Sequence, residues 1–144
     1  MTPITIYTAG YHQSSDLPPQ AVNIACRSSA LWQREGAGKS LGCLFPNSEV
    51  WAASKSGGDW KAAYMKQLAK HLKSGKLADA VRRLAEADVL MCWERSASDC
   101  HRPVAAEFIA ANFPHVTYGG EYWSVAQART KAATPQQLPL NFSK

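Results

Sequence analysis

The sequence predicts an α/β fold in which helices cover a mostly parallel sheet. Short apolar runs rich in β-branched residues at Pro3–Tyr7, Ala21–Cys26 and Val89–Trp93 are typical of strands. Between the second and third runs, Trp60–Ser74 and Leu77–Ala87 carry apolar residues at the 3.6-residue period of a helix. Strands alternating with helices are characteristic of parallel sheets. We therefore expect a three-layer, Rossmann-like domain over residues 1–133.

The first strand is expected to end in a turn at Thr8-Ala9-Gly10, because threonine and glycine follow the apolar run. Such turns lie at the edge of a parallel sheet where sites form, so Thr8 and Gly10 are predicted to contact an anion. Arg27 follows the second strand, and its guanidinium is suited to clamp the same anion. Ser28–Gly58 shows no clear period and is predicted to be a long loop.

The helix predicted at Trp60–Ser74 has one apolar face and one basic face. Lys66, Lys70 and Lys73 share the basic face, and Gly75 suits the residue that follows a helix end. The segment from residue 55 to residue 83 holds eight basic and two acidic residues, an excess of +6 in a chain whose net charge is +5. A concentrated basic surface favours the binding of polyanions, of which nucleic acid is the first candidate. A solvated helix face explains the same pattern.

A buried strand at Val89–Trp93 leads to Glu94 at its carboxyl end. Pro103 suits the first position of the next helix, which is predicted to run to about Asn112. A short strand at His115–Tyr118 and a last short helix within residues 119–133 complete the predicted domain.

The stretch from residue 88 to residue 102 holds the densest reactive chemistry in the chain. His101 and Arg102 precede or begin a helix, where backbone N–H groups and a guanidinium favour an anion. The same field lowers the pKa of a nearby thiol, so Cys100 is a candidate thiolate. Glu94 is a candidate general base, or it pairs with Arg102. We predict Glu94, Cys100 and His101 as catalytic residues, and Arg102 with Arg27 as anion clamps.

Zinc is a weaker alternative at the same place. Cys92, Cys100 and His101 are three possible ligands, but the sequence has no C-x2-C pair. No cofactor is therefore expected. With Cys26 and Cys43 included, the chain has four cysteines. Four cysteines in a chain of this size do not indicate a disulfide framework, so reduced thiols are expected.

Several function classes are disfavoured by spacing. The segment GAGKS at residues 36–40 lacks the first glycine of a Walker A loop, because Gln33 stands there. Nine residues separate Cys92 from Arg102, whereas a C-x5-R phosphatase loop has five.

The chain has no long apolar run and no signal peptide pattern at its start, so we expect no membrane association and a cytoplasmic location.

The segment CWERSASDCHRPVAAEFI, with ITIYTAGYH and WKAAYMKQLAKHL before it, resembles the domain of unknown function 488 family. The resemblance covers roughly residues 4–116 and is carried mainly by the C-x-E and C-H-R elements. It implies this fold and a site at those elements. It bears less on the reaction, because the family has no settled activity. The family's usual Asp-x-Arg is incomplete here, because Ala25 precedes Arg27 by two residues. The resemblance therefore implies loss of an activity that needs that Asp, or use of Glu94 instead.

Residues 134–144 are predicted to form a flexible tail. Its QLPLNF segment resembles the peptide that binds the bacterial sliding clamp. Gln137 would form a hydrogen bond at the rim of the clamp pocket, while Leu138, Leu140 and Phe142 fill apolar subsites. The alternative is that the three apolar residues fold back onto the domain.

These features predict a cytoplasmic protein that binds DNA or a nucleotide and acts in DNA replication, repair or modification. Two alternatives stay open: an enzyme acting on a phosphorylated or nucleoside-like metabolite, and a non-catalytic binding adaptor. Whether the protein is an enzyme is left open.

Overall fold

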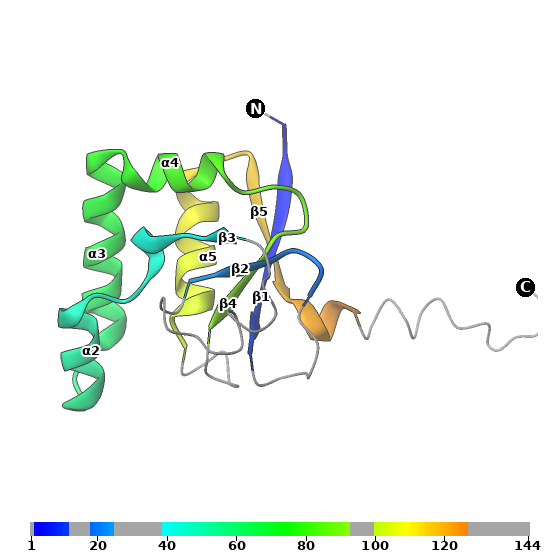
Figure 1. Ribbon diagram of the computed structural model, residues 1–144. Helices are drawn as coiled ribbons and strands as arrows, with labels where there is room; N and C mark the ends of the chain where they lie inside the picture. Colours follow the sequence, from blue (N-terminus) through cyan, green and yellow to red (C-terminus); the bar gives the residue numbers. More distant parts are fainter. Residues whose placement is uncertain (1, 12–17, 25–38, 93–99, 127–144) are drawn as a thin grey trace, which may run out of the picture.

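The computed structural model describes residues 2–11, 18–24, 39–92 and 100–126. Their strands form one parallel sheet in the order β3-β2-β4-β1-β5, which confirms the predicted fold class (Figure 1). The strands are β1 (Ile4–Gly10), β2 (Ala21–Asn23), β3 (Lys39–Ser40), β4 (Val89–Cys92) and β5 (Val116–Glu121).

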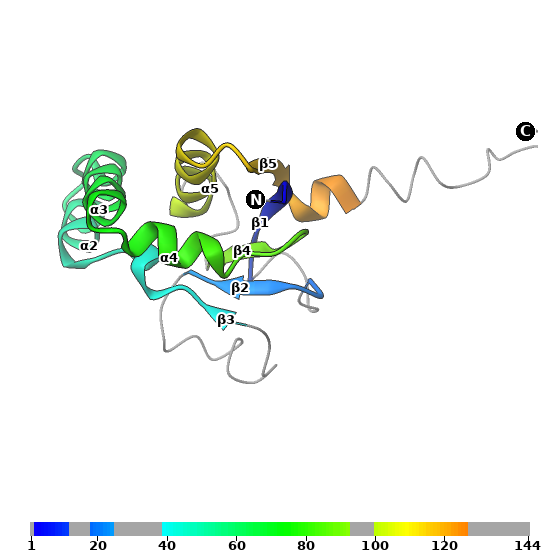
Figure 2. The same ribbon diagram turned by 90° about the horizontal axis from the view of Figure 1, so that it is seen from above.

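Helices α2 (Ser48–Lys55), α3 (Trp60–Ser74), α4 (Lys76–Arg82) and α5 (His101–Asn112) lie on one side of the sheet, together with the short 3-10 helix η1 (Gly42–Leu44). Figure 2 shows these helices on one side and the helical residues 122–126 on the other, which gives the three layers. None of the described helices is both long and apolar enough to cross a membrane.

Side chains alternate along the strands and build a core on each face of the sheet. On the helical side, Ile6 and Leu90 pack with Leu68 of α3 and Ile109 of α5. On the other side, buried strand residues pack against aromatic residues after β5: Tyr7, Ala9, Val89 and Met91 against Tyr122 and Trp123. A sheet buried on both faces explains why β4, one of its central strands, is apolar at every position.

Several element boundaries differ from the prediction. β1 continues through Gly10, because the Tyr11 N–H still donates to the Cys92 carbonyl of β4 at 2.7 Å. The predicted turn at Thr8-Ala9-Gly10 is therefore wrong. α2 lies within the segment predicted as a loop, and only Val50 of its eight residues is buried, so it has no apolar stripe to reveal it. α4 ends at Arg82, well before the predicted Ala87.

Helix α5 begins two residues before the predicted start. Cys100 is its N-cap, so Pro103 is the third residue of the helix rather than the first. A proline is tolerated there because the N–H groups of a first helical turn have no partner within the helix. Gly75 ends α3 with a φ of 88°, in agreement with the prediction.

The end of β5 contains a bulge that matters for the site. Ile6 pairs with Tyr118, but Thr8 pairs with Glu121, so β5 holds one extra residue between the two pairs. Gly120 has a φ of 100° within this irregular segment. Because successive side chains of a strand alternate, the extra residue brings Glu121 onto the same face of the sheet as Thr8.

Gly119 offers a test of how tightly this segment packs. A Cβ atom added there would lie 2.9 Å from both Tyr7 Cδ1 and Thr5 Cγ2, and still closer to Tyr7 Cε1. We expect Gly119→Ala to lower the free energy of unfolding by about 1–3 kcal/mol, because the Tyr7 ring is buried and must move. Gly42→Ala is the control, since no atom lies within 4 Å of its added Cβ. Urea denaturation showing equal costs for the two variants would contradict this packing.

Candidate functional site

The candidate site lies at the carboxyl ends of β1 and β4, which are neighbours in the sheet and pair Gly10 with Cys92. From β1 the chain goes on to β2 on one side, whereas from β4 it goes on to β5 on the other. Ligands of open parallel sheets bind outside the strand ends at such a reversal. The fold therefore brings the C-terminal end of β4 and the start of α5 to the place where a site is expected.

Arg102, in the first turn of α5, is fully buried and forms an ion pair with Glu121 at the end of β5. Its Nη2 lies 2.7 Å from Glu121 Oε1, and its Nε lies 3.1 Å from Oε2. This two-point contact is the geometry in which a guanidinium binds carboxylates and phosphates most strongly. In the described residues, the carboxylate of Glu121 thus occupies the face of Arg102 that a bound anion would use.

The hydroxyl groups of β1 and β5 extend this ion pair. The Thr8 hydroxyl donates to Glu121, and Tyr118 Oη lies 2.5 Å from Thr8 Oγ1. Burial, the largest effect, raises the pKa of Tyr118, so its phenol stays protonated and can donate to Thr8. The result is a continuous chain of hydrogen bonds from Tyr118 through Thr8 and Glu121 to Arg102.

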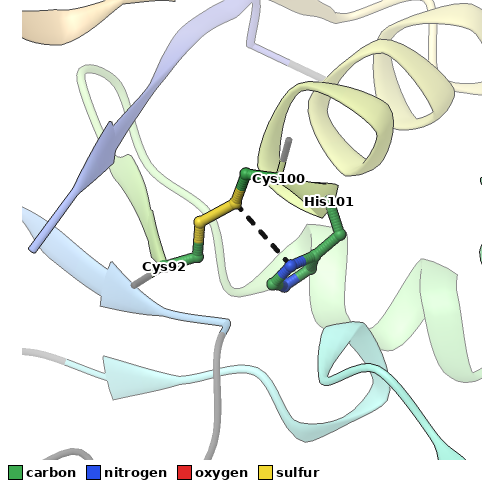
Figure 3. Close-up of side chains that lie close together, drawn as sticks. All are labelled: Cys92, Cys100 and His101. Carbon is green, nitrogen blue, oxygen red and sulfur yellow. Dashed lines mark hydrogen bonds between the residues drawn. A yellow bond between two sulfur atoms is a disulfide. The ribbon is translucent and has the colours of Figure 1, made fainter. Parts of the chain in front are cut away.

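The network reaches the sulfurs of Cys92 and Cys100 through Arg102. The Arg102 Nη1 donates to Cys92 Sγ at 3.3 Å, and the Arg102 backbone N–H donates to Cys100 Sγ at 3.4 Å. The two sulfurs are joined in a disulfide (Figure 3), which corrects the expectation of reduced thiols for this pair. The topology brings the end of β4 next to the start of α5, and the two cysteines therefore meet. The number of cysteines in the chain does not reveal this contact. Cys43 is a free thiol.

His101 is buried beside the two sulfurs, and Figure 3 shows its ring pointing toward them. Its Nε2 lies 2.8 Å from the Ile24 carbonyl oxygen, and its Nδ1 lies 3.8 Å from Cys100 Sγ. A carbonyl only accepts, so Nε2 carries the hydrogen and Nδ1 has a free electron pair. Burial lowers the pKa of His101 to about 4, with Arg102 adding to the effect, so the ring is neutral near pH 7. The ring packs against Tyr64 of α3 in a T-shaped arrangement, with the ring centroids 5.1 Å apart.

The structure brings together part of the predicted site. The start of α5 brings Cys100, His101 and Arg102 close to the end of β1, where Thr8 and Gly10 lie. Thr8 and Gly10 belong to the strand itself and not to a turn after it. Other predicted residues lie outside the described part of the chain: Glu94, Arg27, Gln137, Leu138, Leu140 and Phe142. Lys66, Lys70 and Lys73 are exposed on α3.

The prediction missed several residues of the site, including Tyr118, which was expected only as a strand residue. Glu121 was missed because the strand was expected to end at Tyr118, before the two glycines, and the bulge has no clear sequence signal. Tyr11 and Asn23 are buried, and the Tyr11 hydroxyl donates to Asn23 Oδ1 at 2.9 Å across the ends of β1 and β2. Asn23 is the last residue of β2 and a polar residue within the apolar run Ala21–Cys26, which is the signal that marks it.

Comparisons of the chain with models of known protein families, with characterised proteins and with solved structures find no match. The description of the site therefore depends on its geometry.

The buried ion pair predicts a large stability effect. Glu121→Ala removes the carboxylate that neutralises Arg102, and we expect the free energy of unfolding to fall by about 3 kcal/mol or more. Asp79→Ala is the matched control, because it breaks the Arg82–Asp79 pair, whose side chains are 61% and 69% exposed. That change is expected to cost less than about 1 kcal/mol. Chemical denaturation that finds similar costs for both variants would show that Glu121 is not needed to compensate the buried charge.

Proposed function

We propose that this is a DNA- or nucleotide-associated protein of the domain of unknown function 488 type that acts in the cytoplasm in DNA replication, repair or modification. The observation that supports this best is the exposed basic face of α3. A second candidate, catalysis on a phosphorylated or nucleoside-like metabolite, is favoured by the position of the candidate site at the reversal of the sheet connections.

The basic face of α3 consists of Lys66, Lys70 and Lys73, all exposed. At 100° per residue these three side chains point within about 60° of one another, and they span about 10 Å along the helix axis. Ala62 and Ala69 are exposed on the same side, so no bulky residue keeps a polyanion away from the lysines. The opposite side of α3 is anchored in the core by Tyr64 and Leu68. A row of ammonium groups along one helix suits the phosphates of a nucleic acid backbone.

A triple variant tests this surface. Lys66→Ala, Lys70→Ala and Lys73→Ala together should weaken binding of a short DNA duplex, measured by fluorescence anisotropy. The slope of log affinity against log salt should become shallower by about 3, because three phosphate contacts are lost.

Two controls separate a specific face from diffuse charge. Arginine at the same three positions keeps the charge and should keep the binding. Alanine at Lys55, Lys61 and Lys76 removes the same charge from α2, from another side of α3 and from α4, and should change the slope little. Equal losses in both alanine triples, or no DNA binding by the wild type, would contradict a role for this face.

The C-terminal peptide supports a further part of the proposal, docking on the bacterial sliding clamp. This part depends on the sequence QLPLNF, in which a glutamine and three apolar residues have the spacing of clamp-binding peptides. The proline between Leu138 and Leu140 favours the extended conformation that such recognition needs.

Clamp docking is tested with purified sliding clamp. Deleting residues 137–144 should abolish binding in a pull-down, and Leu138→Ala with Phe142→Ala should weaken it at least about tenfold in calorimetry, since two apolar anchors are lost. Ser143→Ala is the matched control, because it leaves the peptide pattern intact. Unchanged clamp binding after the deletion would overturn the docking proposal.

A further inference from the structure

Cys92, Cys100 and His101 form a compact group of possible metal ligands. Each offers one ligand atom, and the three atoms all lie within 4.8 Å of one another. The residues come from two elements, the end of β4 and the N-terminus of α5, so the fold itself brings them together. All three are buried, which shields a bound ion from competing solvent.

The hydrogen bond of His101 to Ile24 prepares the ring for a metal. In metal sites the second ring nitrogen of a histidine usually donates to a carbonyl or carboxylate, which fixes the orientation of the ring and leaves the other nitrogen as the ligand. Here Nε2 donates to the Ile24 carbonyl, so the electron pair of Nδ1 is available on the side where Cys100 Sγ lies. Packing against Tyr64 holds the ring in this position.

Arg102 prepares the two sulfurs for a metal by donating a hydrogen bond to each of them. One of its N–H groups points at each sulfur, at 3.3 Å and 3.4 Å. Hydrogen bonds of this kind stabilise thiolates, which are the form of cysteine that binds metals. The charges also balance: two thiolates cancel a divalent cation, and Glu121 cancels Arg102.

The spacing of the backbone allows the two sulfurs, once reduced, to separate around an ion. The Cα atoms of Cys92 and Cys100 are 7.3 Å apart, beyond the roughly 4.4–6.8 Å that most disulfides span. Thiolate and imidazole ligands in a tetrahedral arrangement are the preference of Zn²⁺.

We propose that the reduced protein binds one Zn²⁺ per chain through Cys92 Sγ, Cys100 Sγ and His101 Nδ1. The disulfide and the ion use the same sulfurs and exclude each other. Two electrons from a reductant such as a phosphine, with two protons, convert the disulfide to two thiols. Zinc then displaces the two thiol protons as it binds. One tetrahedral position is left for a ligand other than these three residues.

The test uses the full chain without DNA, so its outcome is independent of the proposed function. The protein is reduced with phosphine, loaded with Zn²⁺, freed of excess metal and assayed by elemental analysis and zinc X-ray absorption. We expect one zinc per chain, with two sulfur neighbours at about 2.3 Å and a nitrogen at about 2.0–2.1 Å. Because the wild type is measured, this result does not require any variant to fold. No retained zinc, or a zinc ion without sulfur neighbours, would overturn the proposal.

Variants identify the ligands. Cys92→Ser, Cys100→Ser and His101→Ala should each lower zinc affinity by more than the roughly 10- to 100-fold that loss of an outer hydrogen-bond partner costs. Cys43→Ser is the matched control and should retain one zinc, because Cys43 lies outside the group. Circular dichroism identifies the variants that fold. A folded Cys92→Ser protein with wild-type zinc affinity, or loss of zinc in Cys43→Ser, would contradict the assignment.

Discussion

The buried charge of Arg102 is the constraint on which the carboxyl edge of the sheet depends. A guanidinium that is fully removed from water must have its charge compensated and its N–H groups bonded. Arg102 meets this need by binding Glu121 of β5 and Cys92 of β4, while its backbone N–H bonds the N-cap sulfur of its own helix. A single side chain therefore connects three elements: α5, β4 and β5.

Local patterns predicted most of the fold, because the strands are short apolar runs and the two longer amphipathic segments carry a strong helical period. They failed where burial is slight, as in α2, which has Val50 as its only buried residue. In the site, Cys100, His101 and Arg102 were predicted together because they are adjacent in sequence. Glu121 was not, because its contact with Arg102 depends on strand pairing and on a one-residue bulge that no local pattern reveals.

Helix α3 separates two surfaces of different chemistry. Its outer side carries the lysines, and its inner side presents Tyr64, whose ring meets His101 and whose hydroxyl donates to the Leu44 carbonyl at 2.6 Å. Tyr64 therefore ties the helix both to the segment after β3 and to the imidazole. A polyanion on the outer side and a ligand at the sheet edge would share this one helix as their common support, although they would bind on opposite sides of it.

The bulge in β5 makes the backbone conformation of a short segment as important as its composition. If this segment paired regularly with both residues 119 and 120 present, Glu121 would lie opposite Ala9, on the face of the sheet away from Arg102. The glutamate would still be present in the sequence, but its charge would be absent from the network. A local change of strand register, with no change of sequence, would thus act here as a charge substitution. A chain with one residue fewer between Tyr118 and the Glu would place that Glu on the face of Thr8 by regular pairing, without a bulge.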